Sequence, residues 1–186
     1  MRAMGRLDEA RREVQLAYEL DPFATVPNGM QGWHSFHDRE FDRSLVHYRR
    51  AAQVGAYAGP WVFVALNFSL KDMHDSALYA AHKAADLAPE RPGVLGVLAY
   101  VQARAGQEGA ARETLRRAKL DPREPFDIGR AYVALHEPDR AFAWLERANW
   151  QWPHRAVLSD PSLDPLRADP RFARLTARVA REMGIQ

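Results

Sequence analysis

The chain has 186 residues, of which 47% are hydrophobic and 27% charged, a composition typical of a folded protein with a sizeable core rather than a disordered segment. The 26 Lys and Arg residues nearly balance the 24 Asp and Glu residues and are scattered along the chain, so we expect no nucleic-acid partner. The chain contains no cysteine, which excludes disulfides, thiolate metal sites and thiol nucleophiles.

The first predicted element is an amphipathic helix that ends at Asp21-Pro22. Its apolar residues recur three or four positions apart and define one helix face: Leu7, Ala10, Val14, Ala17 and Leu20. The N-terminus shows no apolar leader, and no uncharged run is long enough to cross a bilayer, so we expect a soluble, cytoplasmic protein with no membrane partner.

The pattern of this helix returns four times further along the chain. Aligning the copies on one small residue gives spacings of 34, 33, 34 and 30 residues between Ala10, Ser44, Ala77, Ala111 and Ala141. A second helix pattern precedes each later copy, and the clearest example starts at Trp61 and continues through Val64, Ala65 and Phe68. We therefore predict helical hairpins over residues 25–56, 58–89, 92–122 and 124–149, with a tightened turn at residues 121–125. Residues 1–22 would be a half repeat.

The sequence W-x2-V-A-x2-F at Trp61 to Phe68, with small residues at the equivalent positions Gly32, Ala99 and Gly129, resembles the tetratricopeptide repeat family. The resemblance implies an all-α, right-handed superhelical solenoid of antiparallel helix hairpins over residues 1–150, closed by a C-terminal capping helix in residues 151–186. It also implies a protein or peptide partner bound in the concave groove. Because the half repeat lacks its first helix, we expect an apolar edge at Leu7, Val14 and Leu16 that promotes self-association.

Three Asp-Pro pairs follow the last repeat. Asp160-Pro161, Asp164-Pro165 and Asp169-Pro170 each predict a capping acid followed by proline at the first helical position. The expected result is a short turn over residues 163–167 and a helix from Arg171 to about Met183. The string SDPSLDPLRADPRFARL resembles the tail that closes tetratricopeptide arrays in many bacterial signalling proteins, which implies the C-terminal module of a larger regulator.

No sequence motif of an enzyme active site is present, and we expect neither an enzyme nor a cofactor. His34 and His37 lie one helical turn apart, and His74 is followed by Asp75. These pairs leave open an alternative function, that of a ligand-sensing or metal-binding regulatory domain of a fused enzyme, although a metal site would need further converging ligands. The prediction is that no metal is bound.

The predicted binding residues follow the small residue of each first helix: Trp33, Leu66, Tyr100 and Arg130. His37 and Arg104 should project the same way from the last turn of their helices. This set suits an extended or helical peptide with apolar anchors and an acidic end. For Trp33 the alternative is a core role in the gap left by the missing helix, and for Trp150 and Trp152 the alternatives are a seal against the cap or an exposed anchor.

Overall fold

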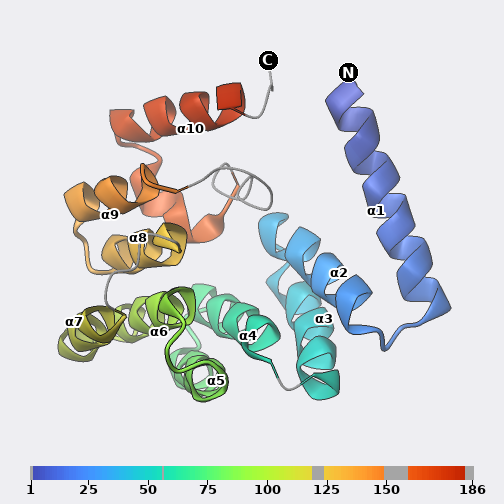
Figure 1. Cartoon of the computed structure of the whole chain (residues 1–186), viewed down its shortest axis with the longest axis horizontal. Coiled ribbons are helices and arrows are strands. Elements are labelled where there is room, and N and C mark those ends of the chain that lie inside the picture. The colour runs from blue at the N-terminus through green and yellow to red at the C-terminus, as the bar shows by residue number, and fades with distance from the viewer. Residues whose placement is uncertain (1, 56, 119–123, 149–158, 183–186) are drawn as a thin grey trace.

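The computed structural model describes residues 2–55, 57–118, 124–148 and 159–182, and within these ranges the protein is built from helices and contains no strand (Figure 1). The helices follow one another as α1 (Arg2–Leu20), α2 (Thr25–His37), α3 (Phe41–Val54), α4 (Ala58–Leu70), α5 (His74–Leu87), α6 (Pro92–Arg104), α7 (Glu108–Arg117), α8 (Pro125–Ala134), α9 (Pro138–Leu145), the 3-10 helix η2 (Pro161–Leu166) and α10 (Pro170–Glu182). None of the helices within the described ranges is both long enough and apolar enough to cross a membrane.

Four helical hairpins share one turn geometry: α2 with α3, α4 with α5, α6 with α7, and α8 with α9. Each pair is joined by three residues, and the middle residue of each turn lies in the left-handed region, namely Arg39, Asp72, Gly106 and His136. In the first turn, Arg39 N donates to Phe36 O and Glu40 N donates to Ser35 O, and the other three turns repeat both bonds at equivalent positions. This is the Schellman arrangement, which satisfies carbonyl groups at the end of a helix. The chain therefore reverses direction in the same way in all four hairpins.

The repeated small residues allow the two helices of a hairpin to cross closely. Ser44, Ala77, Ala111 and Ala141 are all fully buried. A Cβ atom added to Gly32 would lie 2.7 Å from the ring of Tyr48, and one added to Gly129 would lie 3.0 Å from Leu145. A side chain at either position would require the neighbouring Tyr48 or Leu145 to move, so the small residues allow the helices to approach closely.

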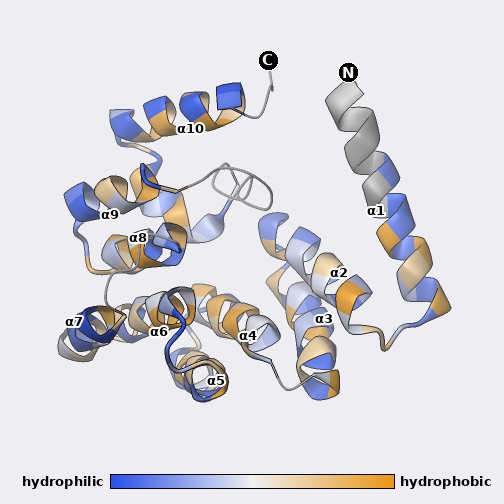
Figure 2. Cartoon of the chain, in the orientation of Figure 1, coloured by the Kyte–Doolittle hydropathy of each residue, from blue (hydrophilic) through white to orange (hydrophobic). Residues whose placement is uncertain are grey.

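Successive hairpins pack side by side into an open arc (Figure 1). Helix α3 packs against α4, α5 packs against α6, and α4 also packs against α6. Figure 2 shows apolar residues concentrated along α4, whereas α7 and α10 carry many hydrophilic residues. A single cluster of buried apolar side chains runs from Phe36 in α2 to Val179 in α10. The first helices of the hairpins supply more of this cluster than the second helices do.

The shortened repeat changes how the fourth hairpin packs. Residues 119–123, which include most of the predicted tight turn, lie outside the described residues. Helix α8 packs closely against α6 and much less against α7. A Cβ atom at Gly96 would lie 2.8 Å from the backbone carbon of Asp127, and one at Gly93 would lie 2.6 Å from the Glu124 carboxylate. These two glycines of α6 allow the first turn of α8 to approach.

The described part of the N-terminal helix is poorly covered. Leu16 is 51% exposed, Leu20 is 79% exposed and Ala17 is also exposed, so part of the predicted apolar face is open. Helix α1 instead contacts its neighbours through polar groups: Gln31 Nε2 donates to Gln15 Oε1 over 2.7 Å, and Arg50 donates to the hydroxyl of Tyr18. Among the described residues, α1 packs mainly against α2, and it meets α3 through Tyr18, which contacts His47 and Arg50.

The C-terminal region divides into two parts. Helix α10 packs against α9, where Arg171 bonds Asp139 Oδ1 over 2.6 Å and Arg178 donates to the Glu146 carbonyl. The preceding helix η2 does not cap the end of the arc but packs against α8 and α4 on its inner side. The expected capping segment is therefore only partly a cap. Trp150 and Trp152 lie outside the described residues.

Candidate functional site on the inner face

The inner face of the arc begins at the last turn of α2. Trp33 and His37 lie one helical turn apart, and their ring centroids are 4.4 Å apart. Both side chains are half-buried, and Trp33 packs against the main core. Ser159 Oγ lies 3.2 Å from His37 Nδ1, although the two residues are 122 positions apart in the chain. Burial lowers the pKa of His37, and the nearby Asp160 carboxylate only partly offsets this effect.

Arg130 forms the centre of a buried polar cluster. Its guanidinium bonds Asp160 Oδ2 over 2.7 Å, Asp127 Oδ1 over 2.5 Å and Ser162 Oγ over 2.8 Å. Burial opposes the charge on Arg130, but the Asp160 and Asp127 carboxylates outweigh that effect and raise its pKa. For Asp160, burial is outweighed by Arg130, so its pKa is lowered. The pair is therefore ionised inside the protein, and each partner compensates the burial of the other.

Tyr100 and Arg104 lie one turn apart on α6, next to this cluster. Tyr100 is only 1% exposed, and burial raises its pKa to about 12. Its hydroxyl oxygen has no hydrogen-bond partner among the described residues. Arg104 is half-buried and donates to Asp72 Oδ1 over 2.5 Å and to the Ser69 carbonyl over 3.2 Å. Arg104 is thus held at the end of its helix by the neighbouring turn.

The predicted exposure of three binding residues is wrong for this structure. Leu66, Tyr100 and Arg130 are 0%, 1% and 3% exposed, so none of them offers a free surface to a partner. The reason is the position of the C-terminal segment: η2 packs against α4 and α8, and its own residues bond Arg130. Trp33, His37 and Arg104 remain half-buried. His37, Tyr100 and Arg130 lie near Asp160, Arg104 lies near Tyr100, and Leu66 serves as a core residue.

The covering segment, residues 159–167, contains the site residues that sequence reasoning did not identify. Arg39 holds Asp164 with two bonds, Nη1 to Oδ2 over 2.6 Å and Nη2 to Oδ1 over 2.8 Å. Asp160 also caps η2, because its carboxylate accepts from Ser162 N over 2.8 Å. Asp164 does not begin a helix as predicted, since it lies inside η2. The repeated Asp-Pro pairs marked these acids in the sequence. Helix capping accounted for the pairs locally, so the sequence offered no reason to expect bonds to distant arginines.

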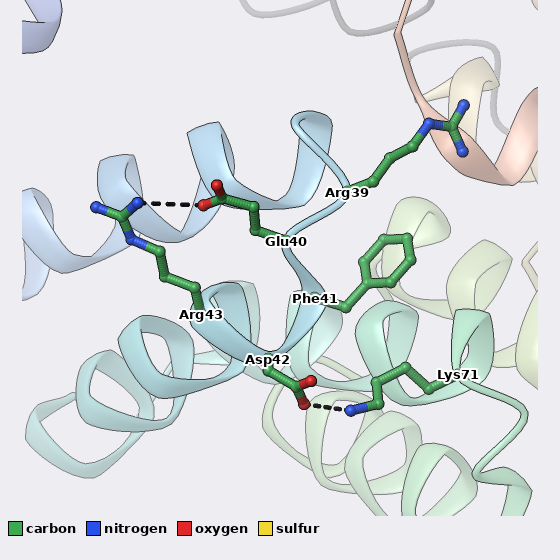
Figure 3. A pocket seen from close by; sticks show the side chains of 6 residues that line it. All are labelled: Arg39, Glu40, Phe41, Asp42, Arg43 and Lys71. Atoms are coloured by element: carbon green, nitrogen blue, oxygen red, sulfur yellow. Dashed lines mark hydrogen bonds and ion pairs between the residues drawn. The ribbon is translucent and has the colours of Figure 1, made fainter.

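Two surface hollows lie outside the inner face. A shallow hollow of about 370 Å³ lies beside the first hairpin turn and the end of α4 (Figure 3). Figure 3 shows Lys71 bonded to Asp42 and Arg43 bonded to Glu40, while Arg39 points away towards η2. A second hollow of about 550 Å³ lies between α3, α4 and α5, where Arg49 lies over the ring of Phe68.

The histidine pairs do not form a metal centre within the described part of the chain. No group of three or more His, Cys, Asp or Glu side chains there is arranged to hold a metal ion. His37 faces Ser159 and the Arg130 cluster, and His74 starts α5.

No protein-family model matches the sequence, and no curated protein matches it either. The repeated hairpins and the inner-face residues are therefore the observations from which a function can be inferred.

Proposed function

We propose that this chain is a protein-interaction module of the tetratricopeptide type, a right-handed superhelical solenoid whose concave inner face binds a peptide segment of a partner protein. Four hairpins with the same Schellman turn, spaced as the sequence repeat is spaced, support this architecture. The buried small residues at each helix crossing support it as well. An array of this kind presents one continuous face built from its first helices.

One observation carries the proposal. The inner face already holds a peptide-like stretch, residues 159–167, which contacts α2, α4 and α8 through side chains from widely separated parts of the sequence. A face that binds one short segment by paired charges and buried leucines has the chemistry to bind another. Trp33, His37 and Arg104 form its half-buried margin, and Leu66, Tyr100 and Arg130 form its floor.

The charges of this face define the partner. Arg39 and Arg130 each hold a carboxylate, and Arg104 lies nearby on α6. A partner segment with acidic side chains and apolar anchors fits these residues better than a basic one, because like charges close together repel. We propose further that the module is cytoplasmic and belongs to a larger bacterial regulator, on the strength of the resemblance of SDPSLDPLRADPRFARL to the tails of such arrays.

Selection from a library of displayed random peptides tests this function. The whole chain and its Asp164→Ala variant, which lacks the bond from Arg39 to residues 159–167, serve as two baits, and we expect enrichment of acidic peptides with leucine or aromatic anchors. Arg104→Ala and Trp33→Ala should weaken binding of the selected peptides by about tenfold each, the effect of losing one good contact. Arg116→Ala, on an exposed face of α7, is the matched control and should change nothing. Failure to enrich any peptide, or enrichment of peptides that bind all variants equally, would contradict the proposal.

A further inference from the structure

Residues 159–167 make the kinds of contact that a bound peptide makes. Asp160 pairs with Arg130 over 2.7 Å, and both side chains are at least 96% buried, at 2% and 4% exposure. Asp164 forms the two bonds to Arg39, and the hydrogen bond from Arg39 lowers the pKa of this carboxyl. Leu163 is fully buried between these two acids. The segment is therefore held by charge at two points and by an apolar side chain between them.

The two anchoring cations come from opposite ends of the repeat array. Arg130 lies on α8 in the fourth hairpin, and Arg39 occupies the turn of the first. The two acids that they hold are only four residues apart in the sequence Asp-Pro-Ser-Leu-Asp-Pro-Leu. The curvature of the arc brings the two arginines to this spacing. The segment on the inner face thus presents a short pattern: an acid, a hydroxyl side chain two residues later, leucine, and a second acid.

We propose that residues 159–167 are an intramolecular occupant of the partner site, and that the partner protein carries a segment of the same acid, hydroxyl, leucine, acid pattern that competes for the site. This inference rests on the proposed function and specifies the partner of the same face. The observation that carries it is that Arg39 and Arg130 both meet carboxylates of one short segment. A basic or uncharged segment would leave Arg39 without this carboxylate and Arg130 with Asp127 alone.

Occupation by the chain itself sets the affinity for a partner. A tethered segment acts at an effective concentration in the millimolar range, so a free segment of equal intrinsic affinity competes poorly. The apparent affinity falls by the fraction of molecules in which the site is open. Weakening the intramolecular contacts should therefore increase the affinity for an added peptide without any change in the receptor residues.

A peptide with the sequence SDPSLDPLR, carrying a fluorophore, provides the probe. Its binding to the wild-type chain and to Asp160→Ala/Asp164→Ala is followed by fluorescence anisotropy. We expect the variant to bind at least tenfold more tightly than the wild type, because its own segment no longer supplies either acid. The control peptide SAPSLAPLR should bind the variant at least tenfold more weakly than SDPSLDPLR. Because the double substitution leaves Arg130 with one carboxylate fewer, Asp164→Ala alone is measured in parallel, and circular dichroism establishes that each variant is folded.

A second substitution locates the peptide. Adding Arg39→Ala to the Asp164→Ala chain should weaken binding of SDPSLDPLR but leave binding of SDPSLAPLR unchanged, since only the first peptide has the second acid. Equal binding of SDPSLDPLR and SAPSLAPLR, or equal affinity of wild type and both variants, would overturn the inference. In that case the proposed function would still stand if the peptide library yields peptides of another chemistry whose binding is weakened by Trp33→Ala and Arg104→Ala.

Discussion

Arg130 and Asp160 form an ion pair of 2.7 Å between α8 and the start of η2, with both side chains almost completely buried. Thirty residues separate them in the sequence, and Asp127 also bonds the guanidinium. A buried pair of this kind is costly to break, because removing one partner leaves the other charged and desolvated.

Arg130→Leu should therefore destabilise the protein by about 3 to 5 kcal/mol. The double variant Arg130→Leu/Asp160→Leu should lose less than Arg130→Leu alone, because it leaves one fewer buried charge without a partner. Urea unfolding of the two single variants and the double variant gives the coupling energy. Arg116→Ala, whose pair with Glu113 is exposed, is the control and should change stability by less than about 1 kcal/mol. Strictly additive effects would show that the pair is not coupled.

Gly96→Ala should destabilise the fold, because the added Cβ would lie 2.8 to 3.0 Å from the backbone and Cβ of Asp127 at the contact between α6 and α8. The expected loss is about 1 to 3 kcal/mol, the range for overpacking. Gly109→Ala in α7 is the matched control, since nothing lies within 4 Å of its added Cβ. That change should stabilise by roughly 0.5 to 1 kcal/mol through helix propensity. Thermal melts of both variants check the contrast, and a neutral Gly96→Ala would mean that α8 can shift.

The stability of the protein should fall as the pH drops below about 6.5 because of His47, the ring of which contacts Tyr18 of α1 and Asn28 of α2. Burial, with Arg43 and Arg50 nearby, lowers the pKa of His47 below its ordinary value of 6.5. The unfolded chain therefore takes up a proton at a higher pH than the folded chain does. The stabilisation that the neutral His47 gives to the folded state is therefore complete above pH 6.5 and is lost as the pH falls below that value.

Comparing His47→Gln with the wild type isolates this histidine from other titrating groups, such as His37, whose pKa is also lowered, and Asp127, whose pKa burial raises to about 6. As the pH falls, the melting temperature of the wild type should fall by more than that of His47→Gln. His82→Gln, at an exposed position in α5, is the control and should follow the wild type. A constant difference across the pH range would exclude His47 as the source.

Self-association through the N-terminal hairpin edge is a further expected property. The sequence predicted this edge at Leu7, Val14 and Leu16. In the structure the exposed apolar residues lie close to the turn between α1 and α2: Leu16, Leu20, Phe23 and Val26 are 51%, 79%, 69% and 76% exposed. The side chain of Leu7 is not among those that the structure describes. Neighbouring exposed apolar residues of this kind favour contact with a second copy. Sedimentation equilibrium should show concentration-dependent association that Leu20→Glu/Phe23→Glu removes and Val54→Glu does not. A monomer at high concentration would contradict this expectation.

The repeat architecture was readable from the sequence because it depends on local and periodic features. Apolar residues three or four apart define each helix, and the small residues at equivalent positions mark each crossing, where the structure buries Ser44, Ala77, Ala111 and Ala141. The helices η2 and α10 also followed from Asp-Pro signals, since Asp160 and Asp169 accept hydrogen bonds from the backbone two residues later. Such interactions involve neighbours in the chain and leave a pattern there.

The occupation of the inner face was decided only by the tertiary structure. The bonds from Arg39 to Asp164 join residues 125 positions apart, and nothing in the local sequence of either residue specifies the other. The same holds for Arg130, which the repeat pattern correctly assigned to a first helix but incorrectly to a free surface. Periodicity determines which side of a helix a residue occupies, whereas burial depends on what the rest of the chain places against that side. Here the curvature of four hairpins brings the two arginines close enough for one short acidic segment to reach both.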